Sequence, residues 1–204
     1  MGTGGDYAAI QIFELPTFEQ IGEWHHNQTP MNQQVRILQG INKHIHDTIM
    51  EKDSTATPQI FYSMENNTIG EAALMRVMDI GEENIMGMFL SEPIRKGHRR
   101  KFRRGFNTTA KHKIDACTKF KELVEGGKMK INSQLLISEM KDFVASGLSY
   151  KAKPGQHDDL VSSCLLMTRM MKVLADFDPK IFEKWTDRTS ELTTPMPIFG
   201  NFYG

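Results

Sequence analysis

The stretch that decides the fold is the segment 155–174, which reads GQHDDLVSSCLLMTRMMKVL. Asp158 and Asp159 stand directly before a long series of apolar residues, and Gly155 marks the loop that precedes them. Carboxylates are favoured in the first turn of a helix because the helix dipole is positive there. The segment therefore predicts the most apolar helix of the chain, opening at the two aspartates and packing against a sheet.

The sequence upstream of that helix alternates between strand and helix patterns. A hairpin of two antiparallel strands is predicted first, and a β-α-β unit follows it after a long helix. In the later segments, threonine and serine precede the predicted helices and glycine follows them, as expected at helix ends. Strands are predicted over 8–15, 18–24, 59–64, 85–90, 128–131 and 148–150, and helices over 31–50, 69–78, 109–125 and 133–144. This order predicts an α/β fold class.

The length and composition of the chain predict one ordinary globular domain. The chain has 204 residues, of which 39% are hydrophobic and 25% are charged. It has neither an apolar run of membrane-spanning length nor the features of a signal peptide at residues 1–6. We therefore expect a cytosolic protein that does not associate with a membrane. Cys117 and Cys164 lie in apolar helical contexts and are predicted to be core thiols.

Acidic residues follow one predicted strand and open the last predicted helix. Glu65 comes after the buried-type strand 59–64, where a side chain can point into the crevice at the strand ends. Asp158 and Asp159 can project toward the same end of the sheet. Convergent carboxylates suit a hard cation, so Mg²⁺ or Mn²⁺ is the expected metal. Two such ions about 3.5–4 Å apart can activate water and stabilise the leaving oxygen of a phosphodiester.

Each of these residues also has a simpler interpretation. Glu65 taken alone is more often a loop carboxylate, and the two aspartates taken alone are more often helix-capping and dipole residues. His157 either orients a ligand, contacts phosphate or is an exposed loop histidine. The pairs His25/His26 and His44/His46 are interpreted as surface residues because their spacings are weak metal signals.

A basic run is the only large electrostatic anomaly in a chain whose formal net charge is zero. Seven of the ten residues from 95 to 104 are basic: Arg95, Lys96, Arg99, Arg100, Lys101, Arg103 and Arg104. A run of this kind is more often a solvated face. If it borders the acidic site, it would bind DNA phosphates. Phe102 and Phe106 in and beside it either pack beneath the loop, which we favour, or stack on bases.

Three motifs, in the right order over about 175 residues, resemble the C-terminal nuclease domain of the large terminase subunit of tailed bacteriophages. They are GTGGDYAAI at 2–10, YSMENNTIG at 62–70 and GQHDDLV at 155–161. The stretch from 109 to 131 also resembles the region between the second and third acidic motifs of that family. The His-Asp-Asp-Leu-Val motif is fairly specific, whereas the glycine-rich start is weak by itself.

The resemblance implies an RNase H-like mixed sheet flanked by helices, two Mg²⁺ or Mn²⁺ ions, and cleavage of concatemeric DNA without sequence specificity. By position in the motifs, Glu65 matches the second acidic ligand and Asp159 the third, with Asp158 and Asp6 as neighbouring acidic positions. The family's first catalytic aspartate lies on an opening central strand that has no counterpart here. We therefore expect a piece of a larger protein, with unpaired sheet edges and weak or no activity in isolation.

The resemblance also implies domain bounds, partners and a location. Residues 1–178 would form the N-terminally truncated nuclease domain and 179–204 a C-terminal tail. The expected partners are double-stranded DNA, the terminase ATPase region, the portal and the small terminase subunit, in the cytoplasm of an infected bacterium. The phosphate loop of an ATPase does not occur in this chain.

Two alternatives from other classes stay open. One is a catalytically inactive module that binds DNA or the portal through the basic run. The other is a different RNase H-like nuclease, such as a junction resolvase or a transposase core, for which a preference for four-way junctions would be diagnostic. The order of the motifs ranks the terminase nuclease above both.

Overall fold

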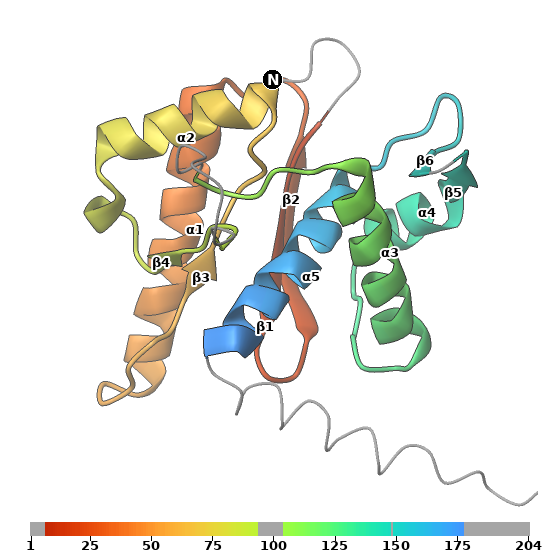
Figure 1. The fold of residues 1–204 in the computed structure, drawn as a ribbon. Helices are drawn as coiled ribbons and strands as arrows, with labels where there is room; N and C mark the ends of the chain where they lie inside the picture. Colours follow the sequence, from red (N-terminus) through yellow and green to blue (C-terminus); the bar gives the residue numbers. More distant parts are fainter. Residues whose placement is uncertain (1–6, 94–103, 148, 178–204) are drawn as a thin grey trace, which may run out of the picture.

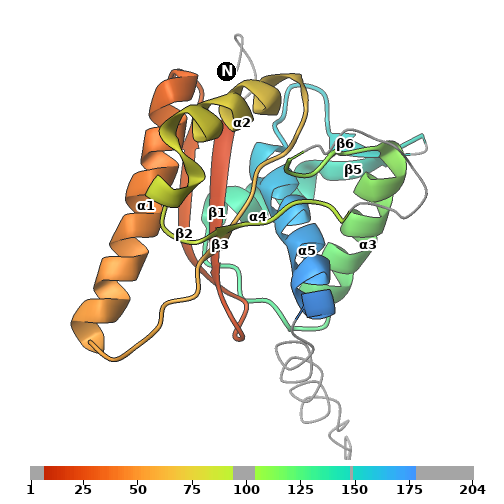
Figure 2. The ribbon, with the colours of Figure 1, turned by 60° about the vertical axis from the view of Figure 1, so that its left-hand side comes forward.

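Helices and short strands alternate along the computed structural model, which describes residues 7–93, 104–147 and 149–177. A central hairpin separates a helix pair from a second helical group (Figures 1 and 2). The strands are β1 (Ala8–Glu14), β2 (Glu19–His26), β3 (Phe61–Tyr62), β4 (Met88–Phe89), β5 (Phe143–Ser146) and β6 (Ser149–Ala152). The helices are α1 (Met31–Lys52), α2 (Thr68–Ile80), α3 (Ala110–Glu125), α4 (Gln134–Asp142) and α5 (Asp159–Phe177), with the 3-10 helix η1 (Glu82–Asn84). The α/β class predicted from the sequence is confirmed.

The predicted N-terminal hairpin is present as β1 and β2. The two strands pair antiparallel from Ala8 opposite His26 to Glu14 opposite Glu19, with one irregularity after Ile12. Phe18 in the connecting turn has a φ of 53°, which is uncommon for a side chain of this size. Its ring is 1% exposed, so burial in the core holds the turn in this conformation.

The predicted β-α-β unit is also present, with shorter strands than the sequence suggested. β3 and β4 pair in parallel over two residues, and α2 makes the crossover between them. The predicted strand 85–90 is interrupted at Gly87, which has a φ of 108° and approaches the Ile60 carbonyl so closely that a Cβ would lie 2.6 Å from it. Only Met88–Phe89 therefore remains extended and paired.

Two predicted elements in the second half of the chain are wrong in detail. The predicted helix 133–144 ends at Asp142, because residues 143–146 pair antiparallel with β6 instead of continuing the helix. The predicted strand 128–131 is reduced to a single bridge, in which the Lys130 backbone bonds to Phe18 and Gln20 at 3.1 and 2.9 Å. Both departures result from pairing between segments that sequence periodicity does not relate.

The single RNase H-like mixed sheet predicted from the resemblance is not seen in residues 7–93, 104–147 and 149–177. The described strands form three separate two-stranded sheets, β1–β2, β3–β4 and β5–β6. The physical reason is that none of these strands pairs with both β1 and β3, so no backbone hydrogen bonds join the two pairs. The described strands therefore show the α/β class but not the RNase H-like sheet, which stays a prediction.

The main core forms where α5 packs against α3, α4 and β1. Its buried members come from the hairpin turn, these helices and the segment after α3: Phe18, Ala116, Cys117, Phe120, Leu123, Met129, Leu136, Leu160, Val161, Cys164 and Leu165. Both cysteines are buried and unpaired, as predicted. Burial raises the pKa of the Cys117 thiol to about 11 and that of Cys164 well above its ordinary value, so both are protonated core groups.

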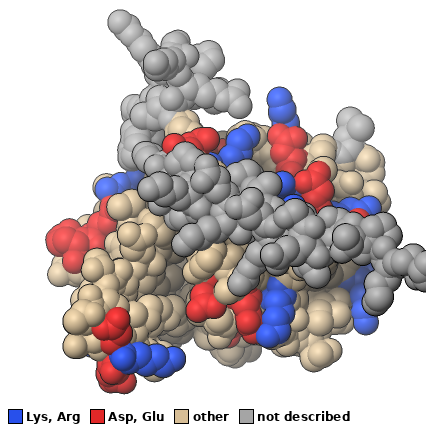
Figure 3. Space-filling model, turned by 90° about the horizontal axis from the view of Figure 1, so that it is seen from below, with Lys and Arg blue, Asp and Glu red and all other residues tan. Residues whose placement is uncertain are grey.

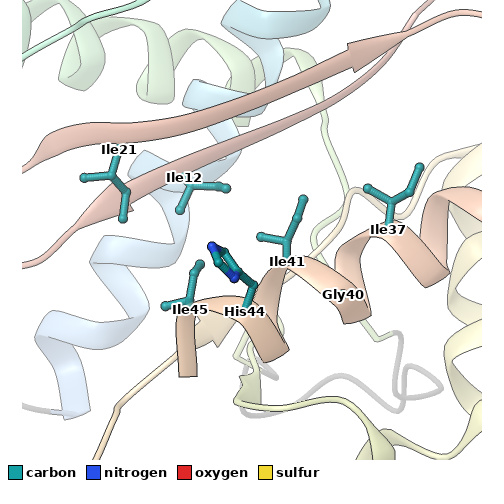
Figure 4. A pocket seen from close by; sticks show the side chains of 7 residues that line it. All are labelled: Ile12, Ile21, Ile37, Gly40, Ile41, His44 and Ile45. Carbon is teal, nitrogen blue, oxygen red and sulfur yellow. The ribbon is translucent and has the colours of Figure 1, made fainter. Parts of the chain in front are cut away.

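An apolar groove of about 400 Å³ lies between the hairpin and α1 (Figure 4). Ile12 and Ile21 face it from the hairpin, and Ile41 and Ile45 face it from α1. Ile21 is 55% exposed, so the helix covers this face of the hairpin incompletely. Within the described part of the chain, no helix is both long and apolar enough to span a membrane.

Candidate functional site

The predicted pair Asp158/Asp159 stands at the start of α5, as the sequence indicated. The Asp159 side chain is 22% exposed, and its Oδ2 accepts a hydrogen bond from the Tyr7 backbone N–H at 3.2 Å. Asp158 Oδ2 lies 3.5 Å from the Lys113 ammonium of α3. The two neighbouring carboxylates are thus held apart, one by the residue before β1 and the other by a lysine on α3.

Three rings, those of Tyr7, His25 and His157, contact one another beside Asp159. The Tyr7 ring stacks on His25 of β2 at 4.2 Å between centroids and meets the His157 ring edge-on at 4.9 Å. His157 Nδ1 lies 3.9 Å from Asp159 Oδ2. The sequence interpretation of His25 as a surface residue is wrong, because its side chain is only 17% exposed. His25 is buried by its contacts with Tyr7 and Glu139, which lie far from it in the sequence.

Burial lowers the pKa of the His25 imidazole below its ordinary value, against the opposing attraction of Asp159 and Glu23. A histidine with a lowered native pKa stabilises the fold above its unfolded pKa, and this stability is lost as the pH falls through the native value. We therefore expect His25→Phe, which retains a ring for stacking, to lose less stability than the wild type between pH 7.5 and 5.5. Urea unfolding at the two pH values measures this. The exposed His44, changed to Phe, is the control, and an unchanged acid sensitivity in His25→Phe would contradict the assignment.

Glu139 of α4 is a further member of the site that sequence reasoning missed. Its Oε2 accepts hydrogen bonds from the backbone N–H groups of Leu160 at 2.9 Å and Val161 at 3.2 Å. Its Oε1 lies 4.0 Å from His25 Nε2. Burial raises the pKa of the Glu139 carboxyl; the two N–H groups oppose this rise, and the charges of Asp159 and Asp158 add to it.

Glu65 lies beyond the end of β3, where the sequence placed it. Its backbone makes an isolated parallel bridge to Phe106, and the neighbouring Asn66 N–H donates to the Phe106 carbonyl at 2.7 Å. The Glu65 side chain accepts a hydrogen bond from the Asn67 amide at 3.0 Å. Asn67 is also the N-cap of α2, so the carboxylate is held against the start of that helix.

The described residues do not assemble a complete metal centre. Carboxylate oxygens are the donors that Mg²⁺ and Mn²⁺ prefer, so the chemistry of Glu65, Asp158 and Asp159 suits such ions. The number of converging groups is too small for such a site, because no three His, Cys, Asp or Glu side chains in the described ranges are grouped to hold an ion. Asp6, the fourth predicted acidic position, lies outside the described residues. The combined metal site therefore stays a prediction.

The predicted DNA-binding run lies almost entirely outside the described residues. Only Arg104 of its seven basic residues is described, and its Nη1 forms an ion pair with Glu82 Oε2 at 2.5 Å. Phe106 is 1% exposed and packs with Leu90, Val173 and Leu174, which confirms the preferred core interpretation for this residue, whereas Phe102 lies outside the described residues. Figure 3 shows basic and acidic side chains interspersed on the visible described surface, without a large field of one sign.

Arg169 of α5 connects the segment after the basic run to the helix that carries Asp159. Its guanidinium is 12% exposed and pairs with Glu92. It donates to the Asn107 carbonyl at 3.1 Å and the Thr108 hydroxyl at 3.1 Å, and stacks over the Phe106 ring at 5.1 Å. The segments on both sides of the basic run are thereby attached to α5.

A comparison with solved structures finds a similarity between this chain and a phage nuclease. The chain is similar to the crystal structure of the large terminase nuclease from thermophilic phage G20c with bound magnesium, with a TM-score of 0.53 and 17% sequence identity. The similarity covers 80% of this chain and 74% of that one. No model of a known protein family matches the sequence. At this level of identity the comparison establishes the fold, and the chain has the fold of a phage large terminase nuclease, as its motifs predicted.

Proposed function

We propose that the chain is the metal-dependent endonuclease domain of a viral DNA-packaging terminase, cutting concatemeric double-stranded DNA by phosphodiester hydrolysis. One observation carries the proposal: in a chain with the fold of a large terminase nuclease, Asp158 and Asp159 open the central helix with their carboxylates partly exposed. The bound magnesium of the phage G20c structure supports divalent metal use by this fold. The RNase H-like sheet belongs to the same proposal.

The proposed roles follow from where each side chain lies. Glu65 and Asp159 serve as ligands of Mg²⁺ or Mn²⁺, with Asp158 and Asp6 beside them. Lys113 balances the charge of Asp158. A complete ligand set needs a further carboxylate from beyond the described residues.

The remaining proposals concern the wider assembly. The nuclease domain comprises residues 1–178, with 179–204 as a tail, and the basic residues Arg95 to Arg104 contact DNA phosphates. The terminase ATPase region, the portal and the small terminase subunit are the proposed protein partners, in the cytoplasm of the infected host. These proposals rest on the motifs described above.

A plasmid assay tests the proposed activity. The chain is incubated with supercoiled plasmid and Mn²⁺, alongside the variants Glu65→Gln and Asp159→Asn. Nicking is expected to fall about tenfold or more in each variant, because each loses one charged metal ligand. Glu125→Gln, which changes a 68% exposed acid on α3, is the matched control and should nick like the wild type. Nicking that survives both site substitutions would contradict the assignment.

The second candidate is a catalytically inactive module that binds DNA or the portal. It is favoured by the lack of a three-residue metal group within the described ranges. Gel retardation of the same plasmid separates the two functions. Retarded but intact plasmid supports the module, nicking lost in Asp159→Asn supports the nuclease, and plasmid that is neither retarded nor nicked contradicts both DNA-directed functions.

A further inference from the structure

The Glu139 side chain is largely buried, and no lysine or arginine of the described residues contacts its carboxylate. Its side chain is 11% exposed, yet the groups that contact its two oxygens in the described structure are backbone N–H groups and a histidine. A buried carboxylate without a lysine or arginine beside it is costly unless other groups solvate it. Here the solvating groups are two backbone N–H groups of α5, at 2.9 and 3.2 Å. These two hydrogen bonds offset part of the cost of burying the Glu139 carboxylate.

The two N–H groups belong to the residues that follow Asp159 directly. The first N–H groups of a helix have no carbonyl partner within the helix, and an acceptor must come from elsewhere. Glu139 supplies that acceptor from a different helix, α4. It thereby fixes the position of the Leu160 and Val161 backbone, and with it the point from which the Asp159 side chain departs.

Glu139 also lies beside the other support of Asp159. Its Oε1 is 4.0 Å from His25 Nε2, a buried atom for which the described residues provide no hydrogen-bond partner. The His25 ring stacks on Tyr7, whose backbone N–H donates to Asp159 Oδ2. One buried carboxylate therefore contacts the helix that carries Asp159 and adjoins the ring that supports its hydrogen-bond donor.

We infer that Glu139 is a positioning residue that directs the Asp159 carboxylate toward the proposed nuclease site. The inference rests on the proposed function, in which Asp159 is a metal ligand. Glu139 acts through the backbone of α5 and through His25 and Tyr7, and does not itself join the ligand set. A purely structural role would make Glu139 important for stability but leave the direction of Asp159 unchanged.

Amide hydrogen exchange at Tyr7 separates positioning from stability. The Tyr7 N–H reports on the Asp159 carboxylate because it donates to Oδ2. In the metal-free, DNA-free chain, Glu139→Ala is expected to accelerate exchange at Tyr7, Leu160 and Val161 by about tenfold, the effect of losing one charge-assisted hydrogen bond. Glu139→Gln keeps an oxygen that can accept the two N–H groups and should stay within about threefold of the wild type.

Two controls complete the experiment. Leu136→Val lowers stability from the same helix without touching the carboxylate, since Leu136 is fully buried in the core. Each variant is measured at the same interval below its own melting midpoint, and each rate is divided by the intrinsic exchange rate at that temperature. The corrected Tyr7 rate should be higher in Glu139→Ala than in Leu136→Val. Asp159→Ala removes the acceptor and sets the upper limit for the Tyr7 rate.

The outcomes are distinct from those of the plasmid assay. Equal Tyr7 rates in Glu139→Ala and Leu136→Val would overturn the positioning role, and so would a Glu139→Gln rate as high as that of Glu139→Ala. Neither measurement needs metal, DNA or activity. The nuclease proposal would instead be contradicted by nicking that is unchanged in Asp159→Asn. The two proposals are therefore tested by different experiments.

Discussion

Replacing Leu160 with alanine is expected to lower the free energy of unfolding by about 3 kcal/mol, because a fully buried leucine loses both its burial and its packing. Leu160 is 0% exposed and belongs to the core cluster in which α3, α4 and the hairpin turn meet α5. Urea unfolding followed by circular dichroism measures the change. The substitution leaves the Leu160 N–H and its bond to Glu139 available, so the effect reports on packing.

The matched control for this prediction is Leu135→Ala. Leu135 lies on α4 and is 59% exposed, so its removal should change stability by no more than about 0.5 kcal/mol. Similar losses in the two variants would show that the cluster around Leu160 does not form the core in solution. A loss confined to Leu160→Ala supports the arrangement of α5 described above.

The second large effect is expected for Arg169→Met, which should cost about 3 kcal/mol. The substitution keeps an unbranched apolar chain but removes the guanidinium that pairs with Glu92 and donates to Asn107 and Thr108. Glu92 is left partly buried without its cation. Because the same groups attach the segment after the basic run to α5, that segment should also become more sensitive to limited proteolysis.

A neighbouring lysine provides the control for Arg169→Met. Lys172 lies on the same helix and is exposed, so Lys172→Met makes the same change of charge without breaking a buried pair. A double-mutant cycle with Glu92→Gln then measures the coupling between the two partners. A cost for Lys172→Met equal to that of Arg169→Met, or a coupling near zero, would contradict a structural role for the pair.

The elements predicted from sequence are those whose signals are local. The apolar run after Asp159 predicted α5, and the alternation on either side of Pro16 predicted the hairpin. Thr109 and Ser133 cap α3 and α4 through hydrogen bonds to His112 and Leu136, as their positions before apolar periods suggested. Such signals depend on residues within a few positions of one another, which is why the sequence suffices to predict them.

The features that the sequence did not reveal depend on pairing between distant segments. The pairing of β5 with β6 ends α4 at Asp142, whereas the apolar periodicity of the sequence predicted a helix to residue 144. The division into three sheets likewise depends on which strand edges find partners. Apolar spacing carries no information about that choice.

The candidate site divides in the same way. Glu65, Asp158 and Asp159 were identified from their positions beside predicted elements and from the family motifs. Tyr7, His25 and Glu139 were missed because each gains its role from a contact with a remote segment. Glu139 is followed in sequence by Met140 and looks like an ordinary polar position on α4, and only its two bonds to α5 distinguish it.

The hydrogen bond from Tyr7 to Asp159 joins residues 152 positions apart and has a consequence for biosynthesis. A ribosome makes Tyr7 long before Asp159, because the hairpin, α1, α2, α3 and α4 are all synthesised between them. Contacts of such long sequence separation carry a high entropic cost of closure and form late in folding. The nascent chain therefore carries an open core until α5 emerges, and the acidic centre is among the last parts of the molecule to be assembled.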